Sequence, residues 1–355
     1  MKAKLKTSEI SRAVKLCVNA LDIKDAVRSN IRFEAEDDQL RLMASNNVYS
    51  ITVSCPCEIE EEGDAVVDGK MAYSVIAKGS GECVFSSDSK SMTIKAIGRT
   101  KLPNIEHELP MIDDVKGKSV VFDAVAFKNA YGRIDYAISE DQSRIILTGA
   151  HIVSDGEKAT LTALDGFRLA QTIIPCEGDA IDIIVPSRIL SAICDAITDG
   201  KLEIVSNGSR ISAVGDRFRI NAVTLSGDYI DTARIIPTDF KTNALIQTSN
   251  IKDCIDSATV ASGASNLVKL ILENDSIVVK SNSGEADFQG DVDAMVEGDG
   301  LSIAFNLKYL IQAISHITTE QCEMHFNSSV SPVIITPHVN ENDDLSLILP
   351  VRTFG

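Results

Sequence analysis

The sequence contains no tryptophan, and aromatic residues make up only 5% of its 355 residues. Such a chain offers few flat side chains on which single-stranded nucleic acid or sugars could stack. It has no run of about 18 apolar residues, so no membrane-spanning helix is expected. The first twenty residues carry Lys, Ser, Glu and Arg throughout and lack the apolar core of a signal peptide. We therefore expect a soluble, cytoplasmic protein.

The eight cysteines are scattered, and no two of them form a Cys-x-x-Cys pair. A chain long enough to bury a large core does not need disulfides, so we expect reduced, structural thiols. Nine prolines and 44% hydrophobic residues are typical of a folded protein. The length suggests two or three domains.

Common catalytic and metal-binding patterns are also missing. The five histidines are dispersed, with no His-Glu-x-x-His pair, and there is no Gly-x-x-x-x-Gly-Lys-Ser/Thr phosphate loop. Acidic runs at 60–62 and 341–344 lack the spaced ligands and glycine of a calcium loop, which favours solvated loop tips. We expect no catalytic residue, no metal and no cofactor, and hence no enzyme.

The charge is unbalanced, because 34 Lys and Arg stand against 51 Asp and Glu, for a net charge of −17. Affinity for the phosphate backbone comes from clustered Lys and Arg, so this balance argues against DNA binding at first sight. Net charge does not fix how the charges are distributed, however, and a basic face can lie within an acidic shell.

Internal repetition is the most informative feature of the sequence. Three segments share an apolar residue, a capping residue, any residue and then a base, followed by an apolar helical stripe and an alternating strand. They read Val67-Asp68-Gly69-Lys70, Val185-Pro186-Ser187-Arg188 and Phe305-Asn306-Leu307-Lys308. The repeat is therefore about 120 residues long, and three copies fill the chain.

A second helix is expected in each repeat, around residues 10–14, 127–131 and 251–255. Ser8, Asp123 and Ser249 stand just before these helices, where a side-chain oxygen can cap the first free amides. Strand pairs are expected between the helices, for example 30–36 with 39–44, and 269–272 with 276–280 across a turn at Asn274-Asp275.

These patterns reset near residues 114 and 239, where a proline and acidic residues separate a final strand from the next repeat. We predict an α+β fold of three domains, 1–114, 115–238 and 239–355, each with two helices on antiparallel sheets.

Each expected helix carries Lys or Arg on its non-core face. For one helix, an ordinary solvated face explains such bases. If all six helices line one side of continuous sheets, the bases form a single positive surface suited to enclosing DNA without reading its sequence. The residues concerned are Arg12, Lys15, Lys70, Lys78, Lys128, Arg133, Arg188, Lys252 and Lys308.

Three stretches, within 161–170, 228–237 and 347–352, contain Leu-Asp-Gly-Phe-Arg-Leu-Ala, Asp-Tyr-Ile-Asp and Leu-Pro-Val-Arg. Together with the three repeats in order, they resemble the bacterial β sliding clamp family, the processivity subunit of the replicative DNA polymerase. The resemblance spans the whole chain. It implies three DNA-clamp domains, a head-to-tail homodimeric ring around duplex DNA and a non-catalytic tethering role.

In that family the three stretches build an apolar pocket between the second and third domains. The pocket takes short peptides from the polymerase, the clamp loader and other DNA-processing proteins. The resemblance implies aliphatic walls, a tight turn at Gly166 and arginines at the rim for polar groups of the peptide. The pocket residues would be Leu147, Leu164, Gly166, Phe167, Arg168, Leu169, Ile230, Arg234, Ile235, Val330, Pro332, Leu347, Ile348, Leu349, Pro350, Val351 and Arg352.

The resemblance also implies DNA contacts from loops and a place for ring closure. The loop bases are Lys24, Arg28, Arg144 and Lys269. Closure would pair an edge of the first domain near 99–105 with an edge of the third domain near Val260 and 267–272.

The chain departs from the family pattern at Leu164, Phe167, Ile230 and Pro332, which make the expected pocket more apolar. It also continues past the usual end with Thr353-Phe354-Gly355. Two positions are open to Phe354: folded toward the pocket, or extending free of the protein, which we favour. The alternative function is a secreted or surface β-rich repeat binding protein without a DNA role. That class predicts a signal peptide and paired cysteines.

Overall fold

The computed structural model describes residues 1–352, which form two compact units. Unit 1 comprises Met1–Lys128, Ser154–Glu157 and Cys176–Leu225, and unit 2 comprises Asn129–Val153, Lys158–Pro175 and the chain from Ser226 onward. The Thr353-Phe354-Gly355 extension lies outside the described residues. Within residues 1–352, no helix is long and apolar enough to cross a membrane.

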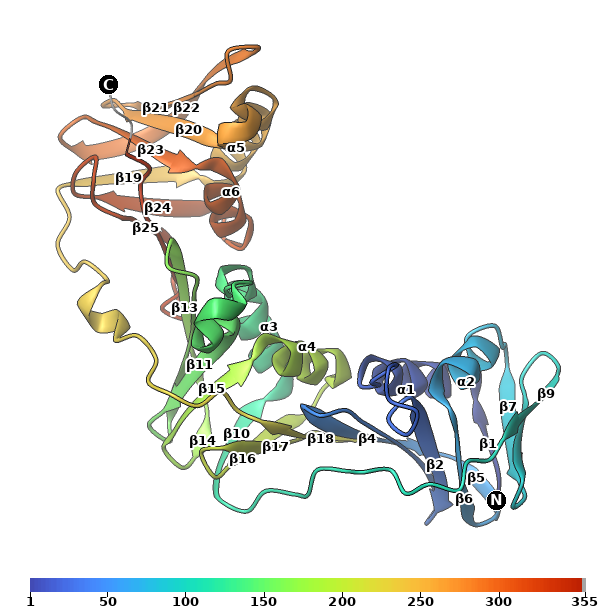
Figure 1. Cartoon of the computed structure of the whole chain (residues 1–355). Helices are drawn as coiled ribbons and strands as arrows, with labels where there is room; N and C mark the ends of the chain where they lie inside the picture. The colour runs from blue at the N-terminus through green and yellow to red at the C-terminus, as the bar shows by residue number, and fades with distance from the viewer. Residues whose placement is uncertain (353–355) are drawn as a thin grey trace. The chain divides into compact units, whose positions relative to one another are not determined.

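Unit 1 contains two antiparallel sheets (Figure 1). The five-stranded sheet has the order β5 (Glu58–Glu61), β1 (Lys2–Lys6), β7 (Glu82–Ser87), β8 (Ser91–Lys95) and β9 (Arg99–Pro103). The nine-stranded sheet has the order β14 (Glu177–Gly178), β10 (Lys118–Asp123), β16 (Lys201–Ser206), β17 (Arg210–Val214), β18 (Phe218–Val223), β4 (Tyr49–Pro56), β3 (Gln39–Ser45), β2 (Asn30–Glu36) and β6 (Gly63–Asp68). Strand β15 (Ile181–Pro186) leads into a helix.

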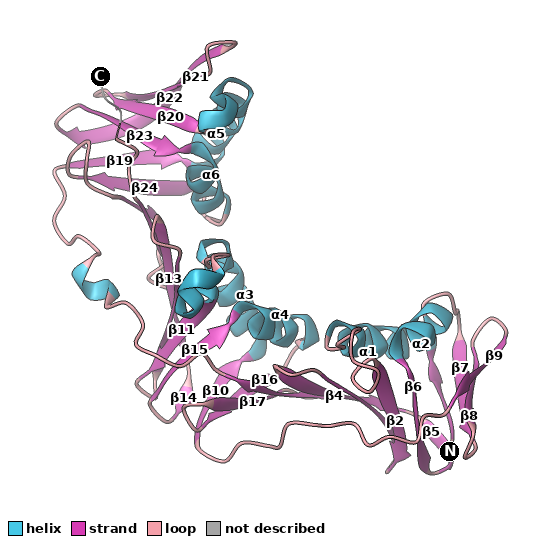
Figure 2. Ribbon diagram, in the orientation of Figure 1, coloured by secondary structure: helices cyan, strands magenta, loops and turns pink. Residues whose placement is uncertain are grey.

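The helices α1 (Thr7–Asn19), α2 (Gly69–Ile76) and α4 (Ser187–Ala196) belong to unit 1 (Figure 2). Asp68 caps α2, because its carboxylate accepts a hydrogen bond from the Met71 amide at 2.7 Å. Helix α1 begins after Lys6 without a side-chain cap, and Ser8 lies inside its first turn. The predicted cap at Ser8 is therefore wrong, because the preceding strand runs directly into the helix one residue earlier than expected.

Unit 2 is built from a second series of antiparallel strands. Their order is β11 (Gly149–Ser154), β12 (Lys158–Leu164), β13 (Arg168–Pro175), β26 (Leu345–Ile348), β25 (Val333–Pro337), β24 (Gln321–Phe326), β19 (Thr242–Gln247), β22 (Asp287–Gly298), β21 (Ser276–Asn282), β20 (Leu267–Leu272) and β23 (Leu301–Asn306). Short 3-10 helices span Asp135–Ala137, Gln142–Thr148, which has a kink at Arg144, Thr232–Arg234 and Gly263–Ser265.

Helices α5 (Thr248–Ser262) and α6 (Leu307–Ser315) lie in unit 2, and α3 (Ala124–Ile134) crosses the boundary between the units. The predicted cap at Asp123 is confirmed, since its carboxylate accepts from the Ala126 amide at 2.8 Å. The cap predicted at Ser249 is wrong, because α5 starts at Thr248 after an uncapped Gln247. All six predicted helices are present, and the α+β fold is confirmed.

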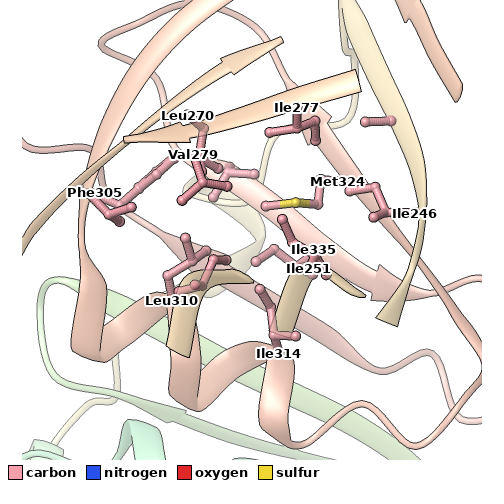
Figure 3. Packing of buried hydrophobic residues seen from close by; sticks show 14 of the residues in the cluster. Ile246, Ile251, Leu270, Ile277, Val279, Phe305, Leu310, Ile314, Met324 and Ile335 are labelled. Carbon is pink, nitrogen blue, oxygen red and sulfur yellow. The ribbon is translucent and has the colours of Figure 1, made fainter. Parts of the chain in front are cut away.

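Helices α5 and α6 share a buried core with the sheets of the third repeat (Figure 3). Strand β24 shows how the sequence builds it, because Cys322, Met324 and Phe326 alternate with half-buried polar residues and are fully buried. From the helices, Ile251 and Leu310 point into the same cluster. Sequence periodicity thus places each helix on its sheet.

Two strand junctions join successive repeats. Within unit 1, β4 of the first repeat pairs with β18 of the second, and Ser50 lies opposite Asn221. Within unit 2, β13 of the second repeat pairs with β26 of the third, and Leu169 lies opposite Leu347. We call these the first and second junctions. The domain boundaries at 114 and 239 fall in the segments between β9 and β10 and between β18 and β19, and they stay predictions.

The segment from residue 104 to residue 117 lies over the first junction. The Asn221 side-chain amide and the Ser50 hydroxyl donate to the Ile112 carbonyl at 2.9 and 3.4 Å. The Val115 amide donates to the Ser212 hydroxyl at 2.8 Å, and Leu109 is buried. We call this segment the first linker; it covers the polar pair at the centre of the junction.

The closing edge predicted near 267–272 is wrong. Strand β20 is interior, because it pairs with β21 on one side and with β23 on the other. The predicted edge near 99–105 is an edge, since β9 ends the five-stranded sheet. In unit 2, the 287–293 segment of β22 pairs only with β21, while residues 294–298 pair with β19.

Candidate functional site

The candidate pocket lies at the second junction, wholly within unit 2. Its floor is an apolar cluster in which every side chain is at least 95% buried. Leu169 and Leu347 face each other across the strand pair, and Leu164 precedes the loop that leads into β13. The cluster consists of Leu147, Leu164, Leu169, Ile334 and Leu347. The structure therefore brings together four leucines that the sequence assigned to the pocket.

Large apolar side chains remain exposed on the segments around this floor. Phe167 is 55% exposed, and Leu349 is 41% exposed. The backbone amide of Leu349 donates to the Phe167 carbonyl at 2.9 Å, so the two residues lie side by side. Ile230, Ile235, Val330 and Val351 are also exposed. Exposed apolar residues gathered beside a buried floor are typical of a site for an apolar ligand.

The 228–236 segment is held against the floor by two side chains. Tyr229 and Ile236 both pack on the apolar cluster. Burial raises the pKa of the Tyr229 hydroxyl, so this group stays protonated. Between them, Ile230 and Ile235 project from the protein, and Arg234 pairs with Asp231 at 2.8 Å while staying largely exposed.

The loop from Asp165 to Arg168 is fixed by its own hydrogen bonds. The Asp165 carboxylate accepts from the amides of Phe167 and Arg168 at 2.8 and 3.1 Å. Gly166 has φ +96°, and a Cβ there would come within 2.6 Å of the Arg144 guanidinium. The turn expected at Gly166 therefore needs glycine for its backbone conformation, whereas the Arg144 side chain could move aside for a Cβ.

Arg168 lies beneath the surface instead of at the rim. Its residue is 9% exposed, and its guanidinium lies 4.4 Å from the ring centre of Tyr309 and 5.4 Å from that of Tyr136. The same group pairs with Asp165 at 3.0 Å and donates to the Gln312 side chain. At the rim, an exposed arginine is supplied by Arg234. The role of these arginines toward a peptide stays a prediction.

A recess of about 430 Å³ lies beside the loop from Asp165 to Arg168. Phe167, Arg168, Tyr309, Tyr136 and Lys308 are among the residues that line it. Phe167 stacks on Tyr309 with 6.2 Å between ring centres. An apolar floor beside a recess lined by aromatic rings and by charges of both signs can hold an apolar anchor and a second side chain of an extended peptide.

Sequence reasoning missed several residues of this region. Ile334 belongs to the floor, while Tyr136 and Tyr309 enclose Arg168. Tyr309 directly follows Lys308 of the repeated motif, which was an available signal. Ile334 gave no such signal, because its strand reads as ordinary core. Of the predicted residues, Ile348 is buried in the core of the third repeat, and Pro332 is half-buried.

The helix bases fall into two groups. The first group consists of exposed lysines: Lys15, Lys70, Lys78, Lys128, Lys252 and Lys308. The three arginines bind protein groups, although Arg12 and Arg188 are also exposed and Arg133 is half-buried. Arg12 on α1 donates to the carbonyls of Asp195, Ala196 and Ile197 at the end of α4, at 3.1–3.3 Å. Arg188 on α4 donates to the Asn19 carbonyl at the end of α1, and Arg133 pairs with Asp344 at 3.0 Å.

The bases expected in loops also differ in their surroundings. Lys24 is exposed, whereas Arg28 pairs with Asp25 at 2.8 Å. Arg144 lies over Gly166 beside the pocket and pairs with Asp141. Lys269 is exposed but lies within strand β20, so its expected loop position is wrong. Which bases touch DNA stays a prediction.

Two family models match the chain: DNA polymerase III beta subunit, central domain, over residues 122–231, and its C-terminal domain over residues 233–352. Curated relatives include the beta sliding clamp of Staphylococcus epidermidis, 26% identical over 352 residues and covering 92% of each chain. The beta sliding clamp of Staphylococcus aureus is 25% identical over 350 residues, with the same coverage.

Solved structures agree with these matches. The DNA polymerase III beta subunit of Thermotoga maritima has a TM-score of 0.92 at 22% identity and covers 99% of this chain and 100% of its own. The sliding clamp of Bacillus subtilis has a TM-score of 0.89 at 23% identity, with 100% of both chains covered. The fold is thus that of the polymerase sliding clamps. With both domain models matched in order, the chain belongs to the DNA polymerase III beta subunit family. The alternative of a secreted repeat binding protein is wrong.

Proposed function

We propose that this chain closes with a second copy into a ring around duplex DNA and tethers the replicative polymerase and other proteins through the pocket at the second junction. It acts as a sliding clamp, a processivity factor that does no chemistry itself. Its place of action would be the cytoplasm. The observation that carries the ring is a pair of strand edges, β9 in the first repeat and residues 287–293 of β22 in the third, which in the described part of the chain lack the partner that their counterparts have in the two junctions.

The open edges correspond to the two edges that meet in each junction. At each junction, the last strand of one repeat pairs with the strand that follows a tight turn in the neighbouring repeat. These pairs are β18 with β4 and β26 with β13. Strand β9 holds the place of β18 and β26 in the first repeat, and the 287–293 segment of β22 holds the place of β4 and β13 in the third. An unpaired edge is a template for another strand. Head-to-tail pairing of two copies would satisfy both edges.

Exposed apolar residues on α2 and α5 support the same joint. Met71 occupies in α2 the position of Ile189 in α4, one residue after the base of the repeated motif. Ile189 is fully buried, whereas Met71 is 57% exposed. Val260 near the end of α5 is 82% exposed. A second copy that covers these side chains would bury apolar surface worth roughly 25 cal/mol per Å².

DNA would be held without sequence readout. The exposed lysines of the helix layer can contact phosphates, while the acid excess elsewhere opposes tight association. We expect weak binding to linear duplex and long retention on closed circles after loading. If loaded protein stays equally long on circles that are then cut, the topological mechanism is wrong.

The dimer has a direct test. Light scattering at micromolar concentration should report twice the chain mass of 38.2 kDa. Met71→Asp would place a charge in the joint and should shift the protein toward the monomer. Val125→Asp on α3 is the matched control, because Val125 is also an exposed apolar helix residue, at 42%. A wild-type monomer or trimer would contradict the proposal.

A further inference from the structure

The three repeats can be aligned residue by residue through one turn. The amide of Asn46 donates to the Tyr49 carbonyl in the first repeat, and the amide of Asp165 donates to the Arg168 carbonyl in the second. In the third repeat the amide of Ser283 donates to the Ala286 carbonyl. The residues that follow these turns are therefore equivalent, and they are Ser50, Leu169 and Asp287.

The strands β9, β18 and β26 can also be aligned, through the residues they pair with in the preceding strands β8, β17 and β25. In the first and second repeats, Thr93 pairs with Lys101, and Ser212 pairs with Asn221. In the third repeat, Ile334 pairs with Leu347. Lys101, Asn221 and Leu347 therefore hold one equivalent position in β9, β18 and β26.

Both junctions use one register for these two positions. Ser50 lies opposite Asn221 at the first junction, and Leu169 lies opposite Leu347 at the second. All four side chains are at least 94% buried. Because the register is the same in two independent junctions, the fold of the repeat determines it, and the chemistry of the pair does not.

From this register we propose that the joint between two copies sets Lys101 of one copy opposite Asp287 of the other as an ion pair. The inference rests on the proposed head-to-tail dimer and specifies how it closes. The same register sets Thr100 opposite Phe288 and Arg99 opposite Gln289. Both Lys101 and Asp287 are exposed in the single chain, which leaves them accessible to a second copy. Directly opposed unlike charges stabilise an antiparallel pair, whereas like charges destabilise it.

The equivalent position thus has a different chemistry at each place. It is polar and covered by the first linker at the first junction, apolar at the second, and ionic at the joint between copies. An apolar peptide would find no floor at the ionic joint. Ion pairing at the joint also makes closure sensitive to salt, whereas neither internal junction has a charged pair at this position.

The helix layer carries a second complementary pair. Arg12, the sixth residue of α1, contacts the end of α4 at the first junction. Asp253 is the sixth residue of α5, and the end of α2 is followed by the exposed Lys78. At the joint, an acid therefore replaces the arginine and a base stands near the end of the facing helix.

Two single variants test the register by mixing. Lys101→Glu leaves acids opposed at both joints of its homodimer, and Asp287→Lys leaves bases opposed at both. Each variant alone should raise the dimer dissociation constant by about tenfold or more, since two joints each lose a pair and gain a repulsion. Mixed in equal amounts, they form a heterodimer with one native and one reversed pair, and dimerisation should return to near the wild-type level in sedimentation runs.

A register control uses Asp291→Lys in place of Asp287→Lys. Asp291 is exposed on the same strand, about 13 Å farther along at ~3.3 Å per residue. Mixing it with Lys101→Glu should not restore the dimer. If Asp291→Lys restores it and Asp287→Lys does not, the register is wrong while the dimer stands. If wild-type protein is itself monomeric, the proposed dimer fails, and this outcome is separate from failed mixing of a dimeric wild type.

Discussion

Phe167 offers the sharpest test of the pocket, because it lies on its surface without holding the floor together. Its side chain is 55% exposed, and its backbone bonds to Asp165 and Leu349 do not depend on the ring. Full burial of a phenylalanine side chain is worth about 1.5–3 kcal/mol. A bound peptide that covers the exposed half would therefore gain about 1 kcal/mol from this ring, or roughly a fivefold change in Kd.

The assay is titration of a fluorescent peptide with leucine and phenylalanine anchors against wild type and Phe167→Ala. We expect the Kd to rise about fivefold while the protein stays folded and dimeric. Val223→Ala is the matched control, because Val223 is a 41% exposed apolar residue of unit 1 and should leave the Kd unchanged. Equal affinity of Phe167→Ala and wild type would refute the assignment of this surface.

Three further predictions follow from burial and bonding. Leu169→Asp puts a carboxylate at a 99% buried position, and thermal melting should show a loss of several kcal/mol, so its effect on peptides reports on the fold. Arg12→Ala removes the donor at the end of α4 and should lower unfolding stability by about 1 kcal/mol, while retention on circular DNA stays unchanged. Burial lowers the pKa of His325, which also lies 3.5 Å from Glu323. As the pH falls, His325 is therefore protonated in the unfolded chain at a higher pH than in the folded protein. The free energy of unfolding should fall as the pH drops below about 6.5. His325→Gln should flatten that part of a denaturation–pH curve, and an unchanged slope would contradict this assignment.

Local patterns predicted the elements well. The repeated motif located α2, α4 and α6, and apolar spacing located the other three helices, because amphipathic periodicity is a local property. Hairpins such as β2 with β3 were also confirmed. The caps failed at α1 and α5, since both helices follow a strand directly and begin one residue before the serine.

The pairing of strands that are distant in the chain could not be predicted from local sequence. The sequence indicates that 267–272 is a strand, but the neighbour that makes it interior is β23, whose residues 301–306 come much later in the chain. Arginine environments were hidden for the same reason. The sequence around Arg168 does not indicate that the rings of Tyr136 and Tyr309 pack against it. The sequence around Arg12 does not indicate its hydrogen bonds to the carbonyls of α4. Such contacts exist only after distant segments meet.

The first linker has a consequence for stoichiometry. By covering Ser50 and Asn221, it removes the one other place in the described chain where a paired junction could receive a foreign peptide. A dimer built from this chain would then offer two docking places, one per copy, instead of four. Proteins that bind through the proposed pocket would have to share two sites, so their order on DNA would depend on relative affinity and local concentration.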